Sequence, residues 1–294
     1  MMKIEIVHLK EHYPLLGEGG KDPVLTCYMP GNLDSMRWTK RRHRAMVVCP
    51  GGGYMDISER ESEPIVLKLL AMDFYVFVLS YSIVPHAFPS QIRETAAAFD
   101  CIHRHAEEWN VDEERIGIMG FSAGAHLAAH YSTAYDCREV AELFPDAYAP
   151  YATVLGYPVI TPDTAHTGSF KNLMGAGRDL SESSAMDVAK LVNDKTPRAF
   201  IWHTAADPVV PVANSLIYAE ALAEHHIPFE LHIYPDGYHG LATSDAMTCN
   251  RDAAVEEYAH AWIPAFKKWA DTYFVSGKWH LNILYILNGL RCLK

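Results

Sequence analysis

A serine between two glycines, in Gly120-Phe121-Ser122-Ala123-Gly124, restricts the fold of this chain more than any other feature. The pentapeptide follows the β-rich run 115–120 and precedes a segment of helical period that starts near Ala123. Such a strand-to-helix turn is strained and brings backbones close together, so glycine is needed where a Cβ would collide. The turn lifts the Ser122 hydroxyl into the open at a helix N-terminus. The sequence therefore predicts a nucleophilic serine at the end of a buried strand.

Short β-rich apolar runs alternate with longer segments of helical period along the rest of the chain. This alternation predicts an α/β fold with a mostly parallel central sheet and helices on both faces. The expected core strands are 45–49, 74–81, 115–121, 152–157, 199–203 and 229–234, and the expected helices are 61–72, 91–109, 123–135, 212–225 and 251–273. We expect a single domain over residues 1–275, with a small excursion at about 158–195 of the kind that shapes substrate pockets.

The two ends of the chain carry weaker signals. Residues 3–9 and 24–29 are expected to pair as an antiparallel hairpin at one sheet edge, because the connection between them is rich in turn-forming glycine. The C-terminal extension 276–294 is apolar, but it is too short and too interrupted by asparagine to span a bilayer. Docking onto the body, a dimer contact and a dispensable extension are all open for it, and we prefer the last two.

A run of three glycines follows the first expected core strand, in Cys49-Pro50-Gly51-Gly52-Gly53-Tyr54. Consecutive glycines leave their backbone N–H groups uncovered and open to a closely approaching ligand. We expect the N–H of Gly52 or Gly53, together with that of Ala123, to form an oxyanion hole, worth about 3 kcal/mol per donor. The alternative is that the glycines only form a flexible turn at the end of the strand. This interpretation is weaker because a serine turn follows later in the chain.

The general base must be chosen among 16 histidines by position. In proteins with such a serine turn, an acid and then a histidine follow the nucleophile along the chain. His239 lies between the last expected strand and the last expected helix, where a base can reach over the end of the sheet. His126 falls one helical turn after Ser122 and is expected to be packed or hydrogen-bonded, while His203 and His232 lie inside strands.

Asp207 is the predicted acid because it follows the penultimate expected strand, 199–203. Its task would be to accept the imidazole N–H of His239, fix the tautomer and stabilise the imidazolium that forms. Asp236 is nearer to His239 in sequence and is the alternative, although an acid in so tight a turn more naturally makes a local contact. Acids of the excursion, such as Asp187, are weaker candidates.

Taken together, these motifs resemble the α/β-hydrolase superfamily over roughly residues 24–273. Within it, the chain is similar to the acetyl-esterase group related to hormone-sensitive lipase, which includes intracellular acetylxylan esterases. The segment 81–89 resembles the Tyr-x-x-x-Pro-x-x-x-Pro stretch of that group, and Gly53-Tyr54 followed by Ser58-Glu59-Arg60-Glu61 is similar to its acetylxylan-type members. Pro50 stands where many esterases have histidine.

The resemblance implies a serine carboxylesterase that forms an acyl-enzyme on Ser122 and needs no metal or organic cofactor. Its substrate would be a small ester, such as an acetylated xylo-oligosaccharide, and Tyr54 would belong to the substrate-binding site. A peptidase, a thioesterase, an arylformamidase and a non-catalytic binding module of the same fold are the alternatives. Against a peptidase, no propeller domain or acidic pair for a substrate amine is visible, and against a binding module, all three catalytic residues are present.

Charge and cysteine content exclude several other classes. The 25 Lys and Arg residues against 36 Asp and Glu give a net charge of -11, which disfavours nucleic acid and an anionic membrane as partners. Charges interrupt the apolar runs at the N-terminus, so we predict no secretory signal and a cytoplasmic protein. The 6 cysteines show no C-x-x-C pair, which predicts free thiols and no zinc site. A homo-oligomer remains open.

Overall fold

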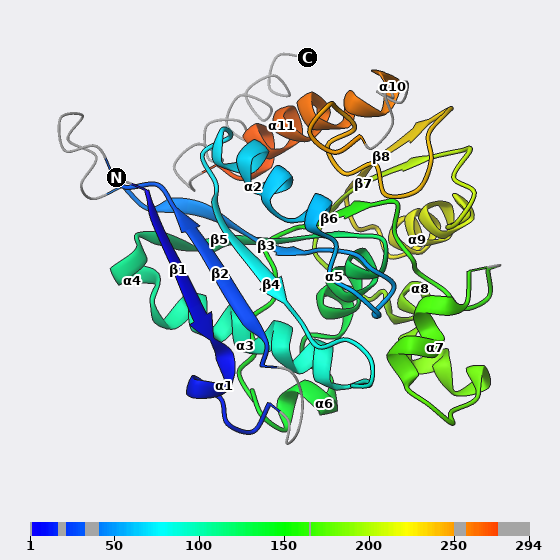
Figure 1. Cartoon of the computed structure of the whole chain (residues 1–294), viewed down its shortest axis with the longest axis horizontal. Coiled ribbons are helices and arrows are strands. Elements are labelled where there is room, and N and C mark those ends of the chain that lie inside the picture. The colour runs from blue at the N-terminus through cyan, green and yellow to red at the C-terminus, as the bar shows by residue number, and fades with distance from the viewer. Residues whose placement is uncertain (1, 17–21, 33–40, 165, 250–256, 276–294) are drawn as a thin grey trace, which may run out of the picture.

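The computed structural model describes residues 2–16, 22–32, 41–164, 166–249 and 257–275, and these form one 8-stranded sheet between helices (Figure 1). The strands are β1 (Lys3–His8), β2 (Val24–Met29), β3 (His43–Cys49), β4 (Tyr75–Ser80), β5 (Val111–Phe121), β6 (Thr153–Gly156), β7 (Ala199–Thr204) and β8 (Phe229–Tyr234). Their order across the sheet is β1-β2-β4-β3-β5-β6-β7-β8.

The pairing of the strands explains why the site residues gather at one edge of the sheet. β1 pairs with β2, and β2 with β4, in antiparallel fashion, whereas all neighbours from β4 through β3 to β8 are parallel. The carboxyl ends of the parallel strands therefore lie along a common edge, which is where open α/β sheets bind their ligands. The predicted fold class is confirmed.

Helices cover both faces of the sheet. They are α1 (Leu9–His12), η2 (Glu59–Glu61), α2 (Glu63–Leu70), α3 (Ser90–Arg104), α4 (Ala106–Trp109), α5 (Ala123–Ala134), α6 (Arg138–Ala141), α7 (Gly168–Met174), η3 (Leu180–Met186), α8 (Val188–Leu191), α9 (Ala213–Glu224), α10 (Glu257–His260) and α11 (Trp262–Tyr273). The apolar sides of α3, α5 and α9 share one buried core, and those of α2 and α11 share the other. In the second core the rings of Trp202 and Trp262 stack with centroids 5.0 Å apart.

Some elements differ from the sequence-based expectation. β5 begins at Val111, ahead of the predicted start at 115, because Val111 pairs with His43 before a register shift. The charged residues that follow Val111 hid this extension, since backbone pairing and not apolar character sets it. The expected helix 91–109 divides at His105 into α3 and α4. Of the expected helix 251–273, residues 251–256 lie outside the described residues.

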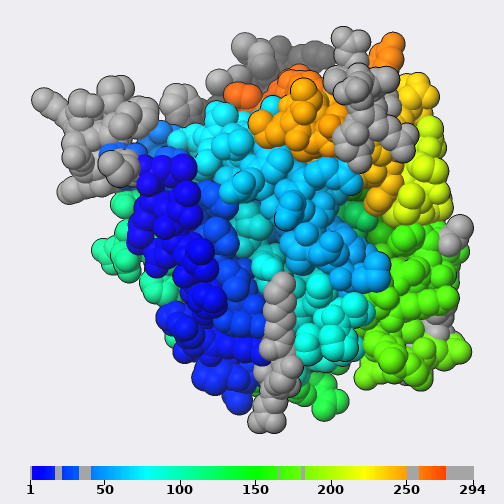
Figure 2. All heavy atoms as spheres, in the orientation of Figure 1, coloured from blue at the N-terminus to red at the C-terminus, as the bar shows by residue number. Residues whose placement is uncertain are grey.

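The predicted N-terminal hairpin is confirmed, with β1 at the edge of the sheet. Figure 2 shows these first strands, in blue, on one side of the molecule and the green segment that contains the excursion 158–195 on the other. That excursion holds α7, η3 and α8, so it is more helical than its weak periodicity predicted. The expectations for 276–294 fall outside the described residues. Among the described helices, none has the length and apolar character that crossing a membrane requires.

Candidate active site

Ser122 lies in the tight turn that joins β5 to α5. Its φ of 53° and ψ of -120° are values that side-chain-bearing residues rarely adopt and that recur at functional sites. A Cβ at Gly124 would lie 2.1 Å from the carbonyl oxygen of Cys49, and one at Gly120 would lie 2.2 Å from that of Gly124. Both glycines are therefore required by close backbone contacts, as the sequence analysis predicted.

Three side chains that are distant in the sequence meet at the carboxyl edge of the sheet. The Ser122 Oγ lies 2.7 Å from Nε2 of His239. The other ring nitrogen of His239, Nδ1, lies 2.7 Å from Oδ2 of Asp207. Ser122 follows β5, Asp207 follows β7 and His239 follows β8. The structure thus brings together the nucleophile, base and acid named from the sequence, in the arrangement of a catalytic triad.

The carboxylate of Asp207 is completely buried. Its Oδ1 accepts hydrogen bonds from the N–H groups of Val209 and Val210, at 2.8 and 2.9 Å, and Nε2 of His203 lies 3.4 Å from Oδ2. Burial alone would raise the pKa of Asp207, but the hydrogen bonds with His203 and His239 outweigh it and hold the pKa well below its usual range. Asp207 is therefore an anion at neutral pH and can stabilise a positive charge on His239.

The other candidates considered for the triad do not join this constellation. Asp236, the alternative acid, is exposed and has no hydrogen bond or ion pair with any described residue. His126 is buried in α5, as predicted, and its Nε2 donates to the carbonyl oxygen of Met186 at 2.8 Å. Burial lowers the pKa of His126 to about 4, so this ring is neutral near pH 7.

Tyr54 takes a different place from the one assigned to it from the sequence. Its side chain is only 1% exposed, and its hydroxyl donates to Nδ1 of His126 at 2.7 Å. The ring packs beneath the glycine loop, edge-on to Tyr81 and His126. Tyr54 therefore supports the loop from inside the core, and its expected role as a substrate-binding side chain is corrected accordingly.

The glycine loop after β3 presents unpaired backbone donors beside the serine. Gly52 and Gly53 have φ values of +125° and +65°, and both line the same cavity as Ser122. Within the described part of the chain, the N–H groups of Gly52, Gly53 and Ala123 have no acceptor. These three N–H groups are the ones predicted from the sequence to form an oxyanion hole, and each is free to donate to an oxyanion.

A buried carboxylate that sequence reasoning left without a role fixes this loop in place. Glu61 is 3% exposed, and its Oε2 accepts a hydrogen bond from the N–H of Gly51 at 2.6 Å. Its Oε1 accepts the hydroxyl of Tyr157 at 2.6 Å, and that hydroxyl in turn accepts the N–H of Ala242 at 3.0 Å. The Tyr157 ring also packs edge-on against His239, with centroids 5.0 Å apart. Glu61 therefore ties the glycine loop to the loops that follow β6 and β8.

A cavity of about 370 Å³ opens over the serine and the histidine. Besides these two, its lining residues are Gly52, Gly53, Asp56, Ser58, Arg60, Glu61, His166, Ser169, Val209 and Gly240. His166 and Ser169 belong to the excursion 158–195, and their side chains are hydrogen-bonded to each other at 2.9 Å. Most of the lining residues have polar or charged side chains, and the excursion contributes two of them. No three His, Cys, Asp or Glu side chains within the described residues are grouped to hold a metal ion.

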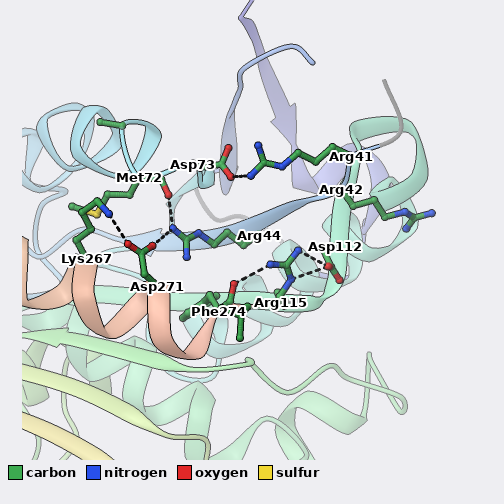
Figure 3. A pocket seen from close by; sticks show the side chains of 12 residues that line it. Arg41, Arg42, Arg44, Met72, Asp73, Asp112, Arg115, Lys267, Asp271 and Phe274 are labelled. Atoms are coloured by element: carbon green, nitrogen blue, oxygen red, sulfur yellow. Dashed lines mark hydrogen bonds and ion pairs between the residues drawn. The ribbon is translucent and has the colours of Figure 1, made fainter. Parts of the chain in front are cut away.

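A larger cavity of about 820 Å³ lies at the opposite end of the sheet, by the amino ends of β3 and β5 (Figure 3). Arg44 donates there to Asp271 at 2.9 Å, and Arg115 pairs with Asp112 at 2.7 Å. Arg41 pairs with Asp73 in the same wall. The described residues that line it include no serine, cysteine or histidine, and Lys267 in this lining donates a hydrogen bond to Asp271.

Comparison with known proteins identifies relatives of this chain. Endo-1,4-beta-xylanase B of Butyrivibrio fibrisolvens is 38% identical over 217 residues, which make up 68% of this chain and 33% of that protein. An acetylxylan esterase of Xylanibacter ruminicola is 29% identical over 236 residues, or 77% of this chain and 45% of that protein. The chain therefore spans less than half the length of these two relatives.

A solved structure matches nearly the whole chain. The acetyl ester-xyloside bifunctional hydrolase from Caldicellulosiruptor lactoaceticus superposes with a TM-score of 0.78 at 32% identity, covering 92% of this chain and 97% of that one. The BD-FAE family model matches residues 33–222. On these matches and on its α/β-hydrolase fold, the chain belongs to the BD-FAE family.

Proposed function

We propose that the protein is a serine carboxylesterase that removes acetyl groups from small esters, among them acetylated xylo-oligosaccharides. The observation that carries the proposal is the continuous line of contacts from Ser122 through His239 to Asp207, with both distances at 2.7 Å. A hydroxyl, an imidazole and a buried carboxylate in this order form the apparatus that activates a serine for attack on a carbonyl carbon.

The reaction would run in two halves. Ser122 attacks the ester carbonyl while Nε2 of His239 takes its proton, and the N–H groups of Ala123 and of Gly52 or Gly53 receive the oxyanion. The ester bond then breaks, His239 gives the proton to the departing alcohol, and the acetyl group stays on Ser122. A water molecule, deprotonated by His239, releases acetate and restores the serine.

The choice of substrate rests on the cavity and on the relatives. A cavity of about 370 Å³ whose lining residues mostly carry polar or charged side chains suits a small alcohol that is rich in hydroxyl groups. The names of two relatives refer to acetylxylan and to an acetyl ester. Peptidases, thioesterases and arylformamidases use the same three groups, and no feature of the cavity favours their substrates.

The proposal is tested by replacing one hydroxyl. Ser122→Ala should lower acetate release from nitrophenyl acetate and from acetylated xylo-oligosaccharides by at least about a thousandfold, because it removes the attacking atom. Ser184→Ala, a change at an exposed serine outside the cavity, is the matched control and should retain full turnover. Turnover by a purified, folded Ser122→Ala protein at the wild-type rate would refute the assignment.

A further inference from the structure

Arg60 is a cation beside the candidate nucleophile, and no acid among the described residues pairs with it. It lies in η2 and lines the cavity that holds Ser122 and His239. Its Nη1 is buried and has no hydrogen-bond partner, and its guanidinium forms no ion pair with any described residue. By contrast, Arg44 and Arg115 of the larger cavity are both paired with carboxylates.

An unpaired guanidinium nitrogen in a buried position is costly, because it loses its water without gaining an acceptor. The chain has 36 Asp and Glu residues and a net charge of -11, so acids to neutralise it are plentiful. The two acids nearest in sequence that line the cavity are otherwise engaged. Asp56 is exposed and accepts the N–H of Ile57 at 2.8 Å, and Glu61 uses both oxygens within the loop network. A buried polar group at a cavity wall that lacks a hydrogen-bond partner needs an explanation. A ligand that enters the cavity and accepts its hydrogen bond provides one.

The contacts of Arg60 place it next to the segment that carries the base. A Cβ built on Gly240 would lie 3.4 Å from Nη2 and 3.9 Å from Cζ of Arg60, so the guanidinium packs against the residue that follows His239. In the proposed reaction, Nε2 of His239 gives its proton to the departing alcohol, which must therefore lie on the His239 side of the cavity. Arg60 stands on that same side.

We propose that Arg60 recognises a carboxylate on the alcohol part of the substrate, so that the preferred substrates are acetyl esters of acidic sugars, such as acetylated oligosaccharides that carry a uronic acid. The proposal rests on the proposed esterase function and adds a substrate class to it. A guanidinium offers its donors in a planar fork that matches the two oxygens of a carboxylate. A neutral hydroxyl accepts only a single, weaker hydrogen bond at the same place.

The first test compares kcat/KM for acetylated xylo-oligosaccharides with and without a uronic acid. The wild type should prefer the acidic substrate by about 10- to 100-fold, mainly through KM, and Arg60→Gln should bring that ratio close to one. Arg60→Lys keeps the charge but loses the fork, so its ratio should be intermediate. Arg138→Gln removes an exposed arginine that does not line the cavity and should leave the ratio as in the wild type. A wild type without preference, or an Arg60→Gln protein that keeps it, overturns the proposal.

The second test uses free D-glucuronate as an inhibitor of nitrophenyl acetate hydrolysis, with D-glucose as its neutral match. Glucuronate should compete in the wild type and not in Arg60→Gln, and glucose should compete in neither. If acetate inhibits as strongly as glucuronate, Arg60 binds the acetate product, and its assignment to the alcohol part of the substrate is wrong. Failure of the wild type to hydrolyse nitrophenyl acetate contradicts the esterase proposal itself, which is a separate result.

Thermal unfolding separates recognition from a structural role. Arg60→Gln removes a partly buried guanidinium that pairs with no described acid, so its midpoint should be no lower than that of the wild type. A midpoint that falls well below that of Arg138→Gln would show that Arg60 holds the loop together, and this result would contradict the proposal.

Discussion

Asp207 combines two properties that normally oppose each other, complete burial and a negative charge. The backbone N–H groups of Val209 and Val210 point at one of its oxygens, and the rings of His203 and His239 approach the other. This set of donors makes the anion the favoured form despite burial. The charge then fixes His239 with its free Nε2 toward Ser122, as a base for that hydroxyl requires.

Asp207→Asn should lower kcat for nitrophenyl acetate by roughly a thousandfold or more. The amide keeps the shape of the acid but can donate to Nδ1, which leaves the proton of the imidazole on the wrong nitrogen. Asp236→Asn is the matched control and should retain nearly full activity, because Asp236 is exposed and contacts neither His239 nor Ser122. The reverse outcome, a large loss for Asp236→Asn and little for Asp207→Asn, would show that the acid is misassigned.

Among single residues, the sequence predicts the positions of those that directly follow a predicted strand. Ser122, Asp207 and His239 each follow a predicted strand, so the parallel sheet brings them to one edge. Tyr54 could not be placed in the same way, because its burial depends on His126 and Tyr81 packing around it. Glu61 escaped assignment for a similar reason, since its partners lie in three other segments of the chain.

Among the elements, three loops at the carboxyl edge are joined through one buried carboxylate. Glu61 holds the N–H of Gly51 in the loop after β3 and the hydroxyl of Tyr157 after β6. Tyr157 in turn holds the N–H of Ala242 and packs against His239, in the segment after β8. The geometry of the glycine loop and that of the base are therefore linked through Glu61 and Tyr157.

Glu61→Ala should lower kcat about tenfold or more with little change in KM, because the glycine loop loses the contact that aims its donors. The matched control is Glu59→Ala, which removes an exposed acid from the same η2 turn and should leave kcat near the wild-type value. Equal kcat for the two variants, measured with nitrophenyl acetate on folded proteins, would exclude this positioning role.

On α3, Glu94 is a fully buried acid that lies away from the triad. It accepts hydrogen bonds from the N–H and the hydroxyl of Ser82, yet burial raises its pKa to about 7. Between pH 4.5, the ordinary value, and about 7, the folded chain thus binds more protons at Glu94 than the unfolded chain does. The stability that Glu94 contributes is present below pH 4.5 and is lost as the pH rises through about 7.

Glu94→Gln should therefore gain stability relative to the wild type as the pH rises from about 4.5 to about 8, by a difference on the order of 3 kcal/mol. Glutamine keeps the size of the side chain and can still bond to Ser82, but it cannot ionise. Urea unfolding at a series of pH values measures the difference, and Glu224→Gln, at an exposed acid, is the control that should show none. A difference for Glu94→Gln that does not change with pH would contradict the raised pKa.

For the molecule as a whole, two of the cavities in the described part of the chain lie at opposite ends of the sheet. The carboxyl edge holds the serine, the histidine and unpaired donors, while the amino edge holds ion pairs such as Arg44 with Asp271. The fold was predictable from the sequence because alternating strands and helices admit few right-handed, mostly parallel arrangements. The first and last residues of the elements were harder to predict than the fold. β5 starts early because Val111 pairs with His43, although polar side chains follow it.

Covalent labelling shows whether Ser122 is the nucleophile and whether His239 and Asp207 activate it. A fluorophosphonate applied to the intact protein reacts with an activated serine hydroxyl, and peptide mass spectrometry locates the adduct. We expect a single adduct on Ser122, with much slower labelling in His239→Ala and Asp207→Asn. An adduct on another residue, or labelling of Ser122 at the wild-type rate in the His239→Ala protein, would contradict this assignment.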